Sequence, residues 1–271
     1  MISTTLQKKE IELTKLLQEQ GSIAIAYSGG VDSTYLAEIA HEALQEQAQI
    51  IIADSPSIPR SELNAAIQIA EERKWNLRII KTSEHLNEEY QANSGDRCYF
   101  CKNELFNEMA TWCKNNGISK MAYGAIMDDL GDHRPGAQAA EEHLVLAPLQ
   151  KVKLTKKEIR ILSQNRQLST ANKASFACLA SRLPVGEEVT VKKLSQIEMA
   201  EEVLKSLDVQ QYRARHHGEV CRIEVSEEDF PKLFDKKQRE KLVGELRKIG
   251  YKHVALDLAG YRTGSTNGLS H

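Results

Sequence analysis

The sequence predicts an α/β fold, a doubly wound and mainly parallel sheet, followed by a small C-terminal α+β domain. Two observations lead to this prediction. Up to about residue 170, short apolar and β-branched runs alternate with segments of helical period, which is typical of a parallel sheet with helices on both faces. After residue 190 the order changes to a helix, two consecutive strands, a helix and a strand, which indicates a separate α+β unit.

The elements of the first domain follow from its apolar pattern. The expected strands are residues 22–27, 49–53, 77–81 and 120–124. Between the second and third strands, apolar residues from Leu63 to Ala70 recur at i, i+3, i+4 and i+7, so one face of that helix should lie on the sheet. Thr155 and Glu158 have the spacing of a capping box and should start the last helix of this domain.

The second domain should contain a helix, two strands, a further helix beginning at Ser226, and a final strand. The first helix and the three strands are expected at residues 191–206, 211–215, 220–225 and 253–258. Gly250 is the predicted C-terminal stop of the later helix. We therefore expect a first domain over 1–170, a linker over 171–189, and a domain for substrate binding and oligomerisation over 190–271.

Composition limits the classes of partner. The chain has 271 residues, of which 41% are hydrophobic and 27% charged, so it can bury a core of its own. Its net charge of −2 gives no global basic field for a nucleic acid, and we do not expect a nucleic-acid partner. No apolar stretch approaches the roughly 20 residues that span a bilayer, and the first residues lack a signal-peptide core. We expect a cytoplasmic protein without membrane contact.

A glycine turn joins the first strand to the next helix in the sequence AYSGGVDSTYL, residues 26–36. The N–H groups of a helix's first turn lack partners and the helix dipole favours negative charge, so a phosphate would bind there. Gly29 and Gly30 let the backbone approach the phosphate oxygens. Ser28 and Ser33 can donate hydroxyl hydrogens, and Asp32 can help to hold Mg²⁺. The alternative is an ordinary strand-to-helix turn with an acid near the helix start.

This loop resembles the PP-loop of the N-type ATP pyrophosphatases, which split ATP into AMP and pyrophosphate to adenylylate a substrate. The segment from Tyr123 to Gly136 resembles the loop that closes over the nucleotide in that superfamily, although its acids could also be solvated loop residues. Asp54 ends the second strand, where a doubly wound sheet binds its ligand. The resemblance implies an adenine nucleotide alpha hydrolase-like domain that binds ATP and Mg²⁺. The expected nucleotide-binding residues are Ser28, Gly29, Gly30, Asp32, Ser33, Asp54, Gly124, Asp128 and Arg134.

Three cysteines carry a second pattern. Cys98 and Cys101 form a C-x-x-C pair just before a helix expected near Lys102, and Cys178 lies beyond the first domain. Thiolates suit iron–sulfur clusters and zinc alike, so both stay open on this ground. A structural zinc would want a fourth ligand, for which Cys113, His85 or His133 could be recruited. We expect Cys113 and Cys221 to be packed core thiols and expect no disulfide framework.

The PP-loop, the sequence DRCYFCK at 96–102 and NKASFACLASRLPVGE at 172–187 together resemble the LarE family over essentially the whole chain. This family consists of ATP-dependent sulfur transferases that make the nickel-pincer cofactor of lactate racemase. One branch has only the late cysteine and sacrifices its sulfur. The other branch resembles this chain and implies a [4Fe–4S] cluster on Cys98, Cys101 and Cys178, with an open iron for a sulfide. Cys178 itself is the alternative sulfur donor.

A basic strand adds a candidate substrate site. Arg213 and Arg215 should share one strand face and clamp a phosphate or carboxylate. The resemblance implies that they bind the phosphate of a mononucleotide substrate, and that Arg262 and Glu201 are further substrate-binding positions. A solvated strand face paired with acids of the next strand is the alternative.

The resemblance implies a two-step reaction with Asp32 and Cys178 as catalytic residues. ATP adenylylates a carboxylate of pyridinium-3,5-biscarboxylic acid mononucleotide, and sulfur then displaces AMP. We expect a sulfide or other sulfur donor as a partner and a homo-oligomeric assembly. Two rival functions are a tRNA thiolase of the same superfamily and a non-catalytic nucleotide-sensing iron or zinc protein.

Overall fold

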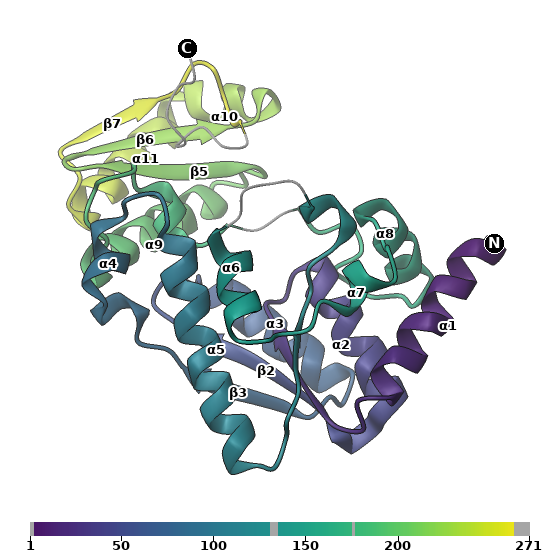
Figure 1. Ribbon diagram of the computed structural model, residues 1–271. Coiled ribbons are helices and arrows are strands. Elements are labelled where there is room, and N and C mark those ends of the chain that lie inside the picture. The colour runs from purple at the N-terminus through teal and green to yellow at the C-terminus, as the bar shows by residue number, and fades with distance from the viewer. Residues whose placement is uncertain (1–2, 131–134, 175–176, 263–271) are drawn as a thin grey trace. The chain divides into compact units, whose positions relative to one another are not determined.

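The computed structural model describes residues 3–130, 135–174 and 177–262, which form two compact units (Figure 1). Unit one comprises residues 1–84 and 98–176, and unit two comprises residues 85–97 and 177–271. Each unit has its own sheet and its own hydrophobic core.

Unit one is built on a four-stranded parallel sheet in the order β3-β2-β1-β4. The strands are β1 (Ile23–Tyr27), β2 (Ala48–Asp54), β3 (Leu77–Lys81) and β4 (Met121–Tyr123). In the register of the sheet, Ile25 of β1 lies between Ile50 of β2 and Ala122 of β4. The predicted α/β class and parallel sheet are confirmed. The strand order changes direction at β1, and doubly wound sheets bind their ligands at such a point.

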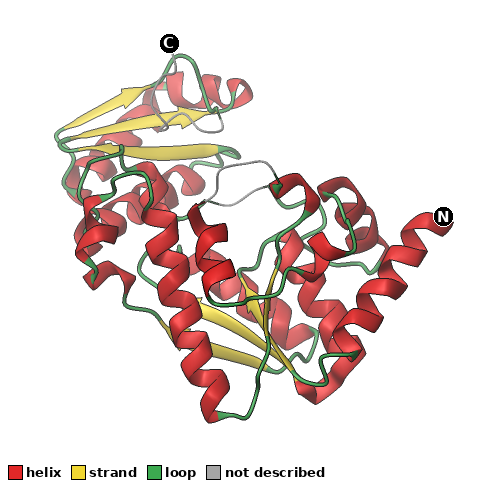
Figure 2. Ribbon diagram, viewed as in Figure 1, coloured by secondary structure: helices red, strands yellow, loops and turns green. Residues whose placement is uncertain are grey.

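Helices cover both faces of this sheet (Figure 2). They are α1 (Thr4–Gln18), α2 (Val31–Leu44), α3 (Arg60–Glu72), α5 (Arg97–Asn115), α6 (Pro135–Glu142), α7 (Pro148–Lys151) and α8 (Lys156–Asn165). Alternate strand residues point to opposite faces. Accordingly, Ile23, Ile25 and Tyr27 share a core with α1, α2, α3 and α8, whereas Ala24 and Ala26 share another with α5 and α6.

The turn between β1 and α2 lies tightly against α3. Gly29 has a left-handed backbone with φ of 69°, and a Cβ placed on it would lie 2.7 Å from the Cβ of Ala66. Ala66 is buried together with Leu63 and Ala70, so the predicted apolar face of this helix packs toward the core. Glycine is therefore required at position 29 by both conformation and space.

Unit two contains a three-stranded sheet in the order β5-β6-β7, in which β5 and β6 are antiparallel and β6 and β7 are parallel. Its elements are α4 (Glu88–Ala92), α9 (Val191–Ser206), β5 (Tyr212–His217), β6 (Val220–Val225), α10 (Phe230–Phe234), α11 (Lys236–Ile249) and β7 (His253–Leu256). The predicted order is observed, with the second helix divided into α10 and α11. Gly250 ends α11 with φ of 115°, as expected for a C-terminal stop.

Residues 85–97 belong to unit two, which the sequence did not predict. The reason is a set of hydrogen bonds to the segment that was expected to be a linker. The amide of Asn93 donates to the carbonyl of Pro184 at 2.7 Å, the N–H of Gly186 donates to the carbonyl of Asn93, and the N–H of Val189 donates to the carbonyl of Gln91. Residues 184–189 are thereby fixed to α4.

Within the ranges that the structure describes, no helix is long and apolar enough to cross a membrane.

Changing Gly29 to Ala should lower the free energy of unfolding more than the same change at Gly21. Gly21 has the same φ of 69° but open space around its would-be Cβ, so Gly21→Ala measures backbone strain alone, about 1–2 kcal/mol. Gly29→Ala adds the contact with Ala66, which should cost roughly 1–3 kcal/mol more. Urea unfolding of both variants measures the difference, and equal losses would show that the contact with α3 does not constrain the loop.

Candidate functional site

The phosphate loop is held by its own serines. The backbone N–H of Ser28 donates to the Ser33 hydroxyl at 3.1 Å, the two hydroxyl oxygens are 3.0 Å apart, and Ser33 donates to the carbonyl of Gly30. Gly30 is the N-cap residue of α2 and provides no side-chain cap. The N-cap residue therefore supplies no side-chain acceptor to the first-turn N–H groups of α2, an arrangement that suits an anion.

Asp32 stands in the first turn of α2 with two differently placed carboxylate oxygens. Its Oδ2 accepts a hydrogen bond from Nζ of Lys156 at 2.7 Å. Its Oδ1 is buried and has no hydrogen-bond partner among the described residues. Burial raises the pKa of Asp32, while the bond to Lys156 lowers it. A buried acceptor without a donor fits a hard cation, so Asp32 is suited to Mg²⁺.

The loop after β4 lies against the start of α2. A Cβ on Gly124 would lie 3.0 Å from the backbone nitrogen of Ser33, a contact tighter than ordinary van der Waals distance, so glycine fits best at this approach. Asp128 accepts the backbone N–H of Lys156 at 2.9 Å, and Asp129 accepts that of Ile126. Lys156 thus contacts Asp128 through its backbone and Asp32 through its side chain.

For two of the predicted nucleotide-binding residues, Asp54 and Arg134, the structure gives a different outcome. Asp54 ends β2 and pairs with Arg60, which also donates to the carbonyl of Ile58 at 2.8 Å. Arg134 lies outside the described residues, as does His133, one of the possible zinc ligands.

Two lysines that contact the phosphate loop were not predicted from the sequence. Lys156 is described above. Lys173 donates to the carbonyl of Gly29 at 3.0 Å and pairs with Glu62 at 2.6 Å. Arg160 holds the carbonyl of Lys173 at 2.9 Å. Only the positions of these lysines could have indicated them, because Lys156 follows the capping-box threonine and Lys173 lies in the motif at residues 172–187. Nothing in the sequence indicated that either lysine contacts the phosphate loop.

The cysteines divide into accessible and buried thiols. Cys98 is exposed, and Cys101 and Cys178 are half-buried. Cys113 and Cys221 are buried as predicted, and burial raises their pKa to about 11 and about 12, which disfavours the thiolate.

The helix carrying the C-x-x-C pair starts earlier than expected. α5 begins at Arg97, so Cys98 lies in its first turn and Cys101 at the start of the second, and the two share one helix face at i and i+3. This pair belongs to unit one and Cys178 to unit two. Within each described part of the chain, no group of three or more His, Cys, Asp or Glu side chains is assembled for a metal.

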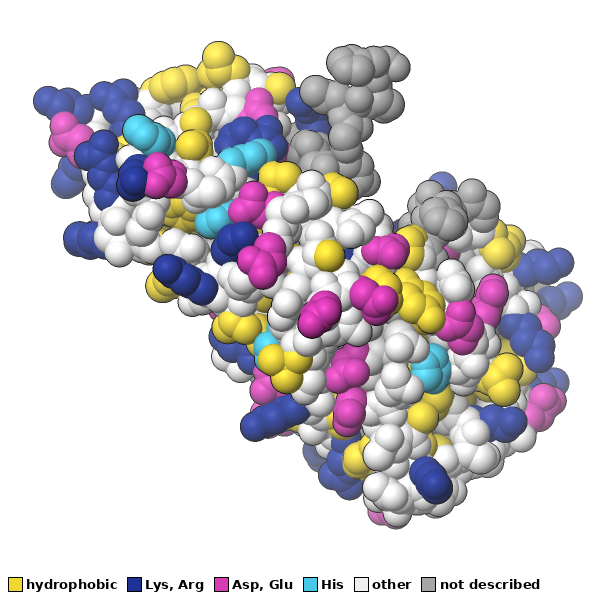
Figure 3. All heavy atoms as spheres, turned by 60° about the vertical axis from the view of Figure 1, so that its left-hand side comes forward, with side chains coloured by type: hydrophobic (Ala, Val, Ile, Leu, Met, Phe, Trp, Pro, Cys, Tyr) yellow, Lys and Arg dark blue, Asp and Glu magenta, His cyan; other side chains and the backbone are white. Residues whose placement is uncertain are grey.

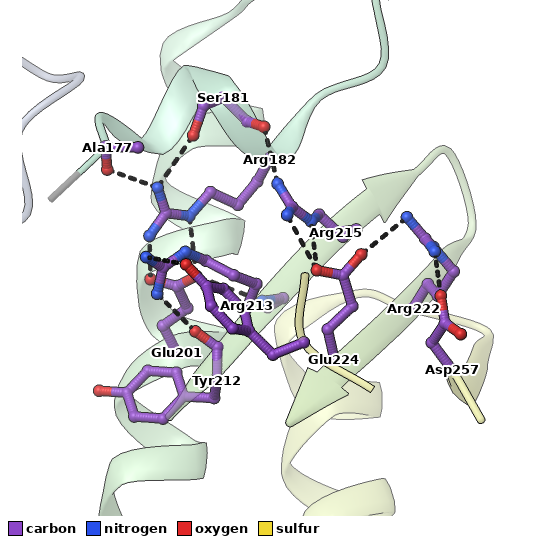
Figure 4. Close-up of polar contacts among 12 residues, drawn as sticks. Ala177, Ser181, Arg182, Glu201, Tyr212, Arg213, Arg215, Arg222, Glu224 and Asp257 are labelled. Carbon is purple, nitrogen blue, oxygen red and sulfur yellow. Dashed lines mark hydrogen bonds and ion pairs between the residues drawn. The ribbon is translucent and has the colours of Figure 1, made fainter. Parts of the chain in front are cut away.

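Unit two gathers the predicted arginines on β5 (Figure 4). Arg215 is buried and pairs with Glu224 of β6 at 2.8 Å, and it donates to the carbonyl of Ser181 at 3.0 Å. Arg213 donates to the carbonyl of Tyr212 and stacks on the ring of Tyr261 at 5.0 Å. The two arginines lie on the same strand, but Arg215 is bound by a carboxylate, whereas Arg213 contacts a carbonyl and an aromatic ring.

Arg213 is the arginine best placed for an anion. In the described part of the chain it has no carboxylate partner within ion-pair distance. Burial lowers its pKa, and the neighbouring charge of Arg182 lowers it further. Since a guanidinium stays charged, this crowding of cations is an electrostatic cost that a bound phosphate would offset.

Glu201 and Arg182 form a further buried pair. Glu201 lies on α9 and accepts from Arg182 at 2.9 and 3.1 Å and from the backbone N–H of Ala214 at 3.2 Å. Arg182 was not predicted from the sequence, although it lies in the motif at residues 172–187. Arg262 is exposed near the end of the described residues.

Known proteins resemble this chain over most of its length. The NAD synthase family model matches residues 5–109. The pyridinium-3,5-bisthiocarboxylic acid mononucleotide synthase of Lactiplantibacillus plantarum is 30% identical over 268 residues, which cover 97% of this chain and 95% of that protein. An uncharacterized protein of Synechocystis sp. is 37% identical over 262 residues, 97% of this chain and 98% of its own length. An uncharacterized protein of Methanocaldococcus jannaschii is 30% identical over 259 residues, 94% of this chain and 98% of its own length.

The PP-loop geometry and these relatives together confirm the resemblance: the chain is an ATP-using PP-loop protein and belongs to the LarE family, which includes the pyridinium-3,5-bisthiocarboxylic acid mononucleotide synthase.

Proposed function

We propose that this protein is a pyridinium-3,5-biscarboxylic acid mononucleotide sulfurtransferase. ATP adenylylates a substrate carboxylate with release of pyrophosphate, and a sulfur nucleophile then displaces AMP to give a thiocarboxylate. The observation that carries the proposal is the phosphate loop, where the uncapped start of α2 and the unpartnered Oδ1 of Asp32 suit a metal-bound polyphosphate.

The loop residues would act on the phosphates. A carboxylate oxygen of the substrate attacks the α-phosphorus of ATP. The bond between the α-phosphorus and the α–β bridging oxygen breaks, and the N–H groups at the start of α2 would bind the pyrophosphate that leaves. Mg²⁺, when bound, would offset the charge on the phosphate oxygens, and Asp32 would hold it. Lys156 keeps Asp32 in place through the 2.7 Å bond to Oδ2. Adenylylation makes the carboxylate oxygen a leaving group for the second step.

Arg213 would bind the phosphate of the mononucleotide. Its guanidinium offers paired donors, its charge is crowded by Arg182, and Tyr261 holds it by ring stacking. Arg215 is engaged by Glu224 and Ser181 and would act by keeping β5 in place. Glu201 would act in the same way through Arg182. Arg262 stays a predicted substrate contact.

Cys98, Cys101 and Cys178 would hold the group that carries the sulfur. The three accessible thiols are the right donors for an iron–sulfur cluster, and the two buried cysteines are not needed. A [4Fe–4S] cluster with three protein ligands would, when bound, offer an iron position for sulfide. In the alternative, Cys178 gives its own sulfur, and each chain would then act once.

Surface charge favours a small substrate over tRNA. On the face drawn in Figure 3, Lys and Arg side chains are interspersed with Asp and Glu side chains. A tRNA partner would be better served by a continuous basic surface. A nucleotide sensor would bind ATP without forming AMP. The sulfur donor, the homo-oligomer and the cytoplasmic location stay predictions.

Asp32→Asn should abolish formation of AMP and pyrophosphate, because the amide keeps the shape but removes the charge that would hold Mg²⁺. The measurement is pyrophosphate release with ATP, Mg²⁺ and the biscarboxylate mononucleotide. Asp208→Asn, a change of the same kind at an exposed carboxylate of unit two, should leave the rate unchanged. Accumulation of ADP in the unaltered protein would contradict the proposed cleavage.

Arg213→Ala should weaken substrate binding by roughly 1.5–3 kcal/mol, about tenfold to a hundredfold, while ATP binding stays nearly constant. Separate titrations of the mononucleotide and of ATP measure this. Arg239→Ala removes an exposed arginine of α11 and should change neither affinity. An equal loss for both ligands would place Arg213 in the nucleotide site instead.

Single changes of Cys98, Cys101 or Cys178 to Ala should each remove iron and sulfur transfer together, because each removes a third of the protein ligands. Cys113→Ala should keep both. Anaerobic iron and sulfide assays and mass spectrometry of the product are the measurements. In the alternative, only Cys178 would matter, and the intact mass after turnover would fall by about 34 Da through loss of H₂S.

A further inference from the structure

Arg182 is an arginine with almost no solvent contact. It ends the short 3₁₀ helix Leu179–Arg182, and only 1% of its surface is exposed. Its Nη1 donates to the carbonyl of Cys178 at 2.9 Å, to the hydroxyl of Ser181 at 3.0 Å and to the carbonyl of Ala177 (Figure 4). The side chain therefore folds back onto the backbone that carries Cys178.

The guanidinium is itself held in one orientation. Nε and Nη2 donate to the two carboxylate oxygens of Glu201 at 2.9 and 3.1 Å, which is a bidentate pair. Glu201 also accepts the backbone N–H of Ala214 at 3.2 Å. Ala214 lies between Arg213 and Arg215 on β5, so the chain of bonds runs from Cys178 to the strand that carries Arg213.

A second arginine ties the same segment to β5. Arg215 donates to the carbonyl of Ser181 at 3.0 Å, and Glu224 fixes Arg215 from the other side. Cys178 is further restrained because its carbonyl accepts the N–H and the hydroxyl of Ser181, at 3.0 and 2.7 Å. Residues 177–182 are thus attached to β5 at two points.

Stability alone does not account for such a network. A buried ion pair is often no more stabilising than apolar residues of the same volume, whereas its directed hydrogen bonds define one geometry. What these bonds define here is the path of the backbone at Cys178 with respect to β5. A sulfur nucleophile depends on such placement, since an error of about 1 Å can cost roughly a hundredfold in rate.

We propose that Arg182 is a positioning residue for Cys178: through Glu201 and β5 it sets the place of this cysteine relative to the anion site at Arg213. The inference rests on the proposed function in so far as Cys178 takes part in sulfur transfer. It assigns Arg182 and Glu201 to the second step of the reaction and gives them no part in the cleavage of ATP.

The test uses the full chain with Arg182→Gln combined with Glu201→Gln. Changing both residues avoids leaving a buried carboxylate without its partner, and the glutamine pair can still form a hydrogen bond. Arg166→Gln with Glu10→Gln is the control, because it neutralises an arginine–glutamate pair of unit one at 2.9 Å that lies away from Cys178 in the sequence and is more exposed. Urea unfolding and circular dichroism establish that both double variants are folded.

Two readouts decide the role of Arg182. The first is the amount of thiocarboxylate formed per pyrophosphate released. The mononucleotide is kept saturating, so that a weaker Arg213 site does not limit the first step. This ratio should then fall at least about tenfold in the Arg182/Glu201 variant, while pyrophosphate release stays within about twofold, because water replaces sulfur at the adenylate. The second is the rate at which iodoacetamide alkylates Cys178 in the iron-free chain, followed by peptide mass spectrometry. This rate should change severalfold, whereas the control should match the unaltered protein in both.

Other results would overturn the inference. Unchanged alkylation together with an unchanged product ratio would show that Arg182 does not position Cys178. A parallel loss of both reaction steps would indicate a merely structural role. Arg182→Lys keeps the positive charge but removes the planar guanidinium. An unchanged yield of thiocarboxylate per pyrophosphate in that variant would therefore also contradict the proposal. If the unaltered protein forms no pyrophosphate, the proposed function fails, and the alkylation rates alone then decide whether Arg182 holds Cys178 in place.

Discussion

The close approach of three backbone segments at the carboxyl end of β1 is the constraint on which unit one depends. At Gly29 there is no room for a side chain against Ala66 of α3, and at Gly124 a side chain would lie tightly against the backbone of Ser33. Two strand ends and two helices can therefore meet around one uncapped helix start. The buried faces of the sheet hold these elements in place, because Ile and Tyr side chains of β1 pack on one side and Ala side chains on the other. The proposed phosphate site thus depends on packing as much as on the loop itself.

Charge is arranged differently in the two units. In unit one, lysines from distant parts of the chain reach the phosphate loop, with Lys156 on Asp32 and Lys173 on Gly29. In unit two, buried arginines are balanced by buried glutamates, which leaves Arg213 as a cation that lacks a carboxylate partner among the described residues. The first arrangement suits a metal-bound polyphosphate, and the second suits a single phosphate group. The two proposed ligands, ATP and the mononucleotide, would therefore each be bound by residues of a different unit of one chain.

The sequence predicted the strands, their parallel arrangement and the later α+β unit because each depends on local patterns. A short apolar run predicts β1, the capping box at Thr155 starts α8, and Gly250 ends α11. Boundaries were less accurate. Asp96, a residue type common at N-caps, directly precedes Arg97 and could have indicated the earlier start of α5. The assignment of residues 85–97 to unit two depends on hydrogen bonds of Asn93 to residues about ninety positions away.

By itself, the sequence determined the fold class, the phosphate loop, the division of the cysteines into accessible and buried thiols, and the family. These follow from residue type and short-range spacing, which can be read directly from the local sequence. Only the tertiary structure decided which charges pair. Arg213 and Arg215 look equivalent on a strand, yet Arg215 is bound by Glu224 and Ser181 while Arg213 faces a second cation. Likewise, nothing local joins Arg182 to Glu201 or Lys156 to Asp32. The physical reason is that a long side chain finds its partner through space, and packing of distant segments, rather than sequence spacing, determines which carboxylates and carbonyls come within its reach.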